Sequence, residues 1–107
     1  MRLRRRPFDE LVDRQLALFA ADESALLEEA DEAEAAWVGS GREEAEEAYG
    51  DYQLVVDAIA DRLLDVRETY AATLADHNAD AYRRAFGSAV RRRFGRYASL
   101  VSDVEPP

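Results

Sequence analysis

The chain has 107 residues with no cysteine and one histidine, and its 23 acidic side chains outnumber 14 arginines, giving a net charge of −9. This length fits a single domain over residues 1–107, and the composition excludes disulfides and cysteine-bound metals. The arginine-rich start at residues 1–7 is not followed by an apolar stretch, and no run approaches the ~20 apolar residues that span a bilayer, so we expect a cytoplasmic protein.

Apolar residues at the start of the chain recur at steps of three and four, which predicts an amphipathic helix over about residues 8–37. Glu23 occupies one position of this stripe. The acid indicates either a kink or a fresh helix start, and we favour a continuous helix. The stripe consists of Phe8, Val12, Leu16, Phe19, Leu26, Ala30, Ala33 and Trp37.

Residues 38–41 carry the clearest turn signal, because two of them are glycines that flank Ser40. Ser40 followed by Glu43 matches a capping box, in which the hydroxyl and the carboxylate satisfy free backbone N–H groups. A second helix is therefore expected over about residues 42–78. Its seam follows a heptad pattern through Ala45, Tyr49, Tyr52, Val56, Ile59, Leu63, Val66, Tyr70, Thr73 and His77.

The end of the second helix follows from folding the chain at this turn. Folding the chain there places Phe19 beside Leu63, so the second helix has no first-helix residues to pack against beyond about residue 78. Asn78 supports that boundary, because asparagine tolerates the left-handed cap conformation. A third helix is then expected over about residues 81–101, followed by a frayed tail over residues 102–107.

These elements predict an all-α fold: an antiparallel helical hairpin of two long helices plus a C-terminal third helix. Two helices alone would expose much of their seam. We therefore expect the third helix, a second copy in a homodimer, or both to complete a bundle. The core or interface residues are Phe19, Trp37, Tyr52, Val56, Ile59, Leu63, Val66 and Tyr70.

The polar clusters of the second helix favour no chemistry. Asp57, Asp61 and Asp65 form a stripe opposite the seam, which we interpret as a solvated acidic face, and His77 as a residue at the bundle end. Carboxylate-bridged metal bundles use Glu-x-x-His motifs, and the chain has none. No nucleophile–base pair or glycine-rich phosphate loop is visible either. We expect no enzyme activity, no metal and no cofactor.

Arginines concentrate at the two ends of the chain. Residues 1–7 carry a charge of +4, residues 8–80 carry −17 and residues 81–107 carry +4. A nucleic acid could bind clustered cations, but the acidic body a helix diameter away disfavours it. An acidic protein partner is favoured instead, bound by Arg84, Arg91, Arg92 and Arg96.

Arg93 is assigned a different role, because on a helical wheel it falls inside the apolar face of the third helix. A buried guanidinium must be paired, since an isolated buried charge costs several kcal/mol. We therefore expect Arg93 to dock the third helix internally. The candidate acids are Asp61, Asp65 and Glu68 on the second helix and Glu23 on the first.

Trp37-Val38-Gly39 lies in the turn of a helical hairpin of about this size. In this respect the chain resembles the WXG100 family of secreted proteins. The resemblance covers roughly residues 8–82 and implies a hairpin that dimerises into a four-helix bundle and passes through a specialised secretion system. The family's Tyr-x-x-x-Asp/Glu signal is missing. The fourth residues after Tyr70, Tyr82 and Tyr97 are Leu74, Phe86 and Val101.

Together these patterns predict a non-enzymatic helical protein–protein interaction or scaffold module that associates with itself and with an unidentified protein. Two alternatives remain open: a WXG100-like secreted hairpin, and a nucleic-acid-associated factor that uses the arginine-rich C-terminal helix. The partner and the pathway have no signature in the sequence.

Overall fold

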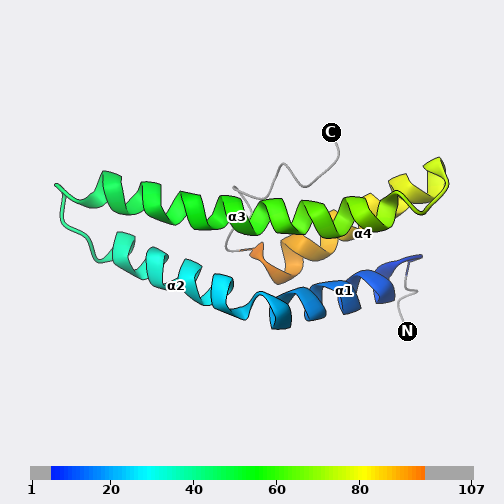
Figure 1. The fold of residues 1–107 in the computed structure, drawn as a ribbon, viewed down its shortest axis with the longest axis horizontal. Helices are drawn as coiled ribbons and strands as arrows, with labels where there is room; N and C mark the ends of the chain where they lie inside the picture. Colours follow the sequence, from blue (N-terminus) through cyan, green and yellow to red (C-terminus); the bar gives the residue numbers. More distant parts are fainter. Residues whose placement is uncertain (1–5, 96–107) are drawn as a thin grey trace, which may run out of the picture.

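The computed structural model describes residues 6–95, which form four helices and no strand. They are α1 (Asp9–Asp22), α2 (Ser24–Val38), α3 (Ala45–Ala71) and α4 (Asp76–Arg93). The all-helical prediction is confirmed. Helices α1 and α2 follow one another along one side of α3, and α4 folds back beside α3 and α1 (Figure 1).

The expected continuous helix over residues 8–37 is wrong, because the chain breaks at Glu23, whose φ of −107° and ψ of 27° are not helical. Glu23 is the acid that interrupts the apolar stripe. The break leaves its carboxylate half-buried at the surface, where it pairs with Arg62 of α3. The break also separates two helices that pack on different partners: α1 packs mainly on α4, and α2 packs mainly on α3.

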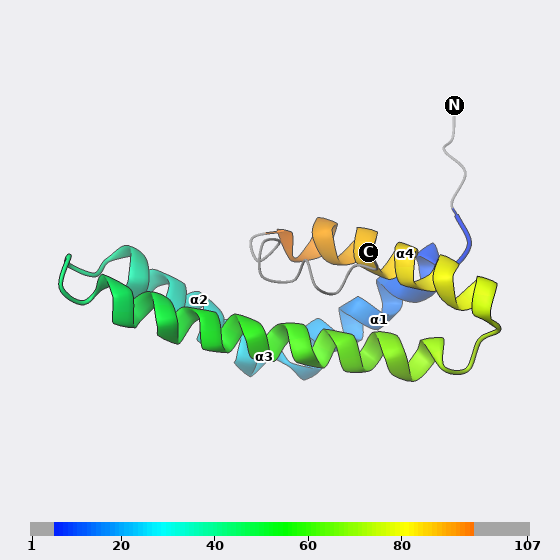
Figure 2. The same ribbon diagram turned by 90° about the horizontal axis from the view of Figure 1, so that it is seen from above.

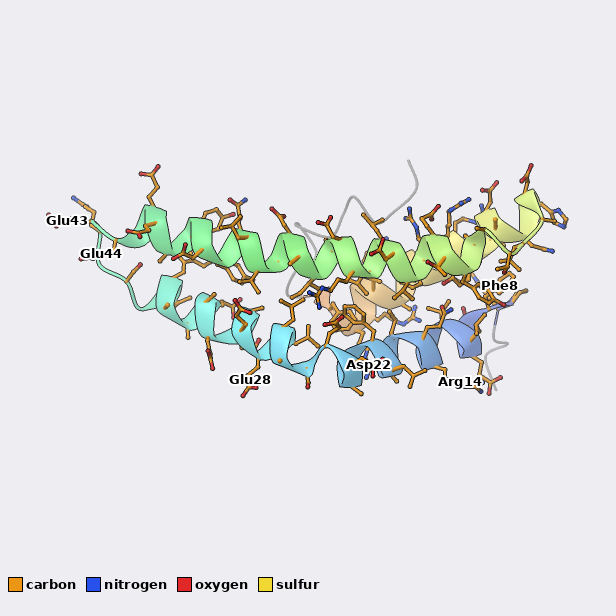
Figure 3. The ribbon with its side chains drawn as sticks, viewed as in Figure 1. Phe8, Arg14, Asp22, Glu28, Glu43 and Glu44 are labelled. Atoms are coloured by element: carbon orange, nitrogen blue, oxygen red, sulfur yellow. The ribbon has the colours of Figure 1, made fainter. Side chains whose placement is uncertain are left out.

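The capping box expected at the turn does not form. Helix α3 begins at Ala45, and no side chain caps its first turn. The Ser40 hydroxyl instead donates to the carbonyl oxygen of Trp37 at 2.6 Å, and the same carbonyl accepts the Ser40 backbone N–H at 3.2 Å. Glu43 and Glu44 lie in the turn at the tip of the hairpin (Figure 3).

The boundary expected near residue 78 is also wrong, because α3 ends at Ala71 and α4 starts at Asp76. The Thr73 hydroxyl donates to the Tyr70 carbonyl at 2.7 Å, and Ala75 is extended with ψ of 153°. Asn78 therefore lies inside α4 and caps nothing. Helix α4 ends at Arg93, before the expected residue 101, and the expected helix beyond residue 95 and the tail 102–107 lie outside the described residues.

Tyr82 holds α4 in place. Its side chain is fully buried, and its ring lies 5.7 Å from the Phe8 ring and 4.8 Å from the Tyr70 ring. The phenol donates to Oε1 of Gln15 at 2.7 Å, which satisfies its polar atom. Phe8 has a φ of 73°, a left-handed conformation that is uncommon for an aromatic residue. One ring from α4 thus contacts the start of α1 and the end of α3.

The two ends of the molecule are built differently. At one end α1, α4 and the C-terminal half of α3 surround a shared core, whereas at the other end α2 and the N-terminal half of α3 stand alone (Figure 2). The two-helix end relies on Trp37, whose ring lies 4.8 Å from the Tyr49 ring and stacks on Tyr52 at 5.8 Å. Helix α4 therefore covers only part of the hairpin.

We predict that Leu63→Ala destabilises the fold strongly. Leu63 is 0% exposed, and truncating a buried leucine leaves a cavity that costs about 2–5 kcal/mol. In a domain whose total stability is about 5–15 kcal/mol, thermal denaturation followed by circular dichroism will show a clear decrease in Tm. Val38→Ala, at a valine of α2 that is 74% exposed, is the control and will leave Tm near the wild-type value. Equal Tm values for both variants would contradict this core.

Candidate interaction surface

A groove runs between α1 and α3 on the side away from α4. It consists of two adjoining hollows of about 520 and 250 Å³ that share Gln15 and Val66. Leu18 from α1 and Tyr70 from α3 supply apolar walls. Leu18 is 59% exposed, while Val66 and Tyr70 are half-buried. The groove therefore presents apolar surface that no described part of the chain covers.

A second groove, formed by one hollow of about 470 Å³, lies between α2 and α3. Its lining includes the small residues Ala33 and Ala36 and the exposed side chain of Leu54. Its charged residues are acidic: Glu29, Glu32 and Asp51.

The two grooves use the same face of α3, as the spacing of their lining residues on this helix shows. Seven of the ten lining residues on α3 follow one another at intervals of three, four or seven, which places them along a single helix face, and the other three lie directly beside that line. Helices α1 and α2 form the opposite wall in turn. We call this continuous surface the open face. On α3 it contains Ala48, Asp51, Leu54, Val55, Arg62, Asp65, Val66, Thr69, Tyr70 and Thr73.

The structure separates the expected core or interface residues into two groups. One group is buried inside the fold and cannot reach a partner: Phe19, Tyr52, Val56, Ile59 and Leu63. The other group, Trp37, Val66 and Tyr70, is half-buried and packs against that core. Of these, Val66 and Tyr70 lie on the open face. Trp37 and Val38 are the last two residues of α2, and Gly39 is the first residue of the turn.

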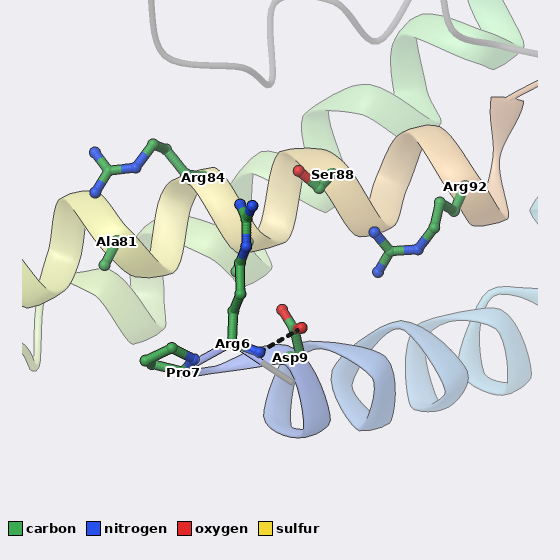
Figure 4. Close-up of a pocket in the computed structure, with 8 residues that line it drawn as sticks. Arg6, Pro7, Asp9, Ala81, Arg84, Ser88 and Arg92 are labelled. Atoms are coloured by element: carbon green, nitrogen blue, oxygen red, sulfur yellow. Dashed lines mark hydrogen bonds between the residues drawn. The ribbon is translucent and has the colours of Figure 1, made fainter. Parts of the chain in front are cut away.

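Two of the four expected partner-binding arginines lie at a separate hollow of about 420 Å³ between the start of α1 and α4. Arg84 and Arg92 line it, and Arg6 reaches toward α4 from the other wall (Figure 4). Arg92 lies 3.8 Å from Asp13, and Arg91 donates to the Ser88 hydroxyl at 3.3 Å. Arg96 lies outside the described residues. We call this surface the basic hollow.

Arg93 does not occupy the internal position expected for it. It is exposed as the last residue of α4, and the buried position at that end is taken by Phe94, whose ring lies 5.9 Å from the Phe19 ring. Within residues 6–95 Arg93 makes no ion pair, whereas Glu23 pairs with Arg62. The helical wheel misplaced Arg93 because the helix ends there.

The ion pair that ties α4 to α3 involves Arg83 instead. Its Nε lies 3.0 Å from Oε2 of Glu68, and its second terminal nitrogen lies 2.9 Å from Oε1, a two-point contact. Arg67 donates to the same carboxylate at 2.7 Å. Hydrogen bonds from Arg83, assisted by Arg67 and opposed by partial burial, lower the pKa of Glu68 from 4.5 to about 2.

Sequence reasoning missed several of these positions for identifiable reasons. Leu18 lies outside the apolar stripe of the first helix and Leu54 lies outside the heptad seam of the second, so the periodicity assigns neither leucine a role. Arg83 belongs to the basic segment over residues 81–107, and the charge of that segment does not distinguish it from its neighbours. The expected solvated acids Asp57, Asp61 and Asp65 are exposed, as is His77. Within residues 6–95 no cluster of histidine and acidic side chains could hold a metal ion.

We predict a pH-dependent contribution of Glu68 to stability. Its depressed pKa means that the folded state favours the carboxylate, so the stabilisation is present at neutral pH and is lost as pH falls from about 4.5 toward 2. Glu68→Gln will therefore lower Tm at pH 7, and its difference from the wild type will shrink toward zero near pH 2.

Arg83→Ala will lower Tm at pH 7, whereas Arg93→Ala will not. The reverse order of the two arginine variants would show that Arg93 docks α4.

Comparisons with known proteins add no relative. No protein-family model, no curated protein and no solved structure matches this chain. In the part of the chain that the structure describes, no helix is long and apolar enough to cross a membrane. The function is therefore inferred from the shape and charge of the chain's own surfaces.

Proposed function

We propose that this chain is a non-enzymatic helical interaction module that self-associates through its open face. The observation that carries the proposal is the one-sided cover of the hairpin. Helix α4 packs on one side of α1 and α3, and on the other side the apolar wall formed by Leu18, Val66 and Tyr70 has no cover among residues 6–95.

Helical hairpins commonly bury such a wall by adding a helix from another molecule, which completes a larger bundle. A helix seated along α3 would contact Leu54 at one end of the open face and Tyr70 toward the other. The half-buried side chains of Val66 and Tyr70 would then become buried. Apolar residues that remain partly exposed in the single chain therefore support a role in binding.

We predict that apolar contacts at this face drive association. Leu18→Gln combined with Leu54→Gln removes both exposed leucines and keeps the charge constant. At about 100 μM, light scattering will give the wild type a mass above the 12.0 kDa of one chain. The double variant will have the mass of one chain, and its circular dichroism spectrum will match that of the wild type because both side chains are exposed and contribute little to the fold of a single chain.

Val38→Gln is the control, since Val38 is 74% exposed but lies at the end of α2 away from the open face. It will associate like the wild type. A wild type that scatters as a single chain under these conditions would contradict self-association, and equal loss in the control would contradict the assignment to this face.

A further inference from the structure

The open face carries excess negative charge along its length. Glu29, Glu32 and Asp51 line the α2–α3 part, and within residues 6–95 they make no ion pair. Asp22 and Asp65 line the α1–α3 part. The one cation there, Arg62, is already paired with Glu23. A partner that covers the open face must therefore bring positive charge.

Like charges disfavour a symmetric pairing of two open faces. A two-fold axis through this contact would place the acidic open face of one copy against the equally acidic open face of the other. Such juxtaposition opposes binding, and salt would relieve it by screening. Face-to-face dimers should thus become more stable as the ionic strength rises.

The basic hollow offers the complementary surface on the same chain. Arg6 and Arg84 form no ion pair with the described residues, and Arg92 has only a long contact to Asp13. Between these arginines lie the small or apolar side chains of Pro7, Ala81 and Ala85, which leave room for a protruding leucine. The carboxylate of Asp9, the one acid in the lining, accepts a hydrogen bond from the Arg6 backbone N–H at 3.1 Å.

We propose that the occupant of the open face is the basic hollow of a second copy of this chain, with Leu54 of one copy directed toward Ala81 and Ala85 of the next. This inference rests on the proposed function and specifies its partner. The two surfaces lie in different grooves, one between α3 and the α1–α2 wall and the other between α1 and α4. Each contact therefore leaves one surface of each kind unused, and copies add head to tail into a ring or an open chain.

Charge reversal on each surface tests this pairing. Glu29→Arg with Glu32→Arg makes the open face basic, and Arg84→Glu with Arg92→Glu makes the hollow acidic. Each variant alone will lose association by about tenfold or more, because like charges then meet at the contact. An equimolar mixture of the two variants will associate again, because each then meets a complementary partner. Sedimentation velocity will show this recovery directly.

Three further measurements complete the test. Wild-type association will weaken between about 50 mM and about 500 mM salt, as expected for opposite charges. Arg14→Glu with Arg42→Glu has the same charge change outside the basic hollow and will associate like the wild type. Circular dichroism will confirm that every variant remains folded.

Three outcomes would overturn the inference. If the Arg84 and Arg92 reversal leaves association unchanged while the Leu18 and Leu54 change abolishes it, the open face binds something other than the basic hollow, and the proposed function survives. Association that strengthens with salt would indicate face-to-face pairing. A wild type that stays a single chain at low salt would remove both the inference and the proposed self-association.

Discussion

The buried ring of Tyr82 contacts Phe8 at the start of α1 and Tyr70 near the end of α3, and this contact decides where α4 lies. Burial raises the pKa of the Tyr82 phenol to about 12, so the group stays neutral and bonded to Gln15 at physiological pH. Because α4 is fixed on this side, the opposite wall of α1 and α3 stays uncovered. The open face is thus a consequence of one aromatic docking contact.

Glu23 has a comparable influence on the other side of the hairpin. A straight helix through this position would have to follow a single partner along its whole length. The break allows α1 to turn toward α4 while α2 continues along α3. It also places an acid at the surface instead of in the apolar stripe, where an unpaired charge would be costly. The helix opposite α3 therefore changes from α1 to α2 at Glu23, and the open face remains continuous.

Much of the fold was readable from periodicity, because an apolar side chain every three or four residues has few alternatives to an amphipathic helix. Val56, Ile59 and Leu63 follow the heptad and are fully buried. Helix ends were not readable, because the sequence pattern did not decide which local hydrogen bond forms: the Ser40 hydroxyl bonds backward to the Trp37 carbonyl, and the Thr73 hydroxyl bonds to the Tyr70 carbonyl where α3 ends. The surfaces proposed for binding combine residues from helices far apart in sequence, which a wheel of one helix does not show.

The unequal cover of the hairpin has a consequence for its dynamics. The α2–α3 end buries few side chains, chiefly Ala30, Tyr52 and Val56, whereas the end that contains α4 surrounds its core on three sides. Backbone amides in α2 should open and exchange with solvent more readily than those in the C-terminal half of α3, because regions with fewer buried contacts unfold locally at lower free energy. A copy seated on the open face would slow that exchange. The tip of the hairpin would then report the assembly state of the whole chain.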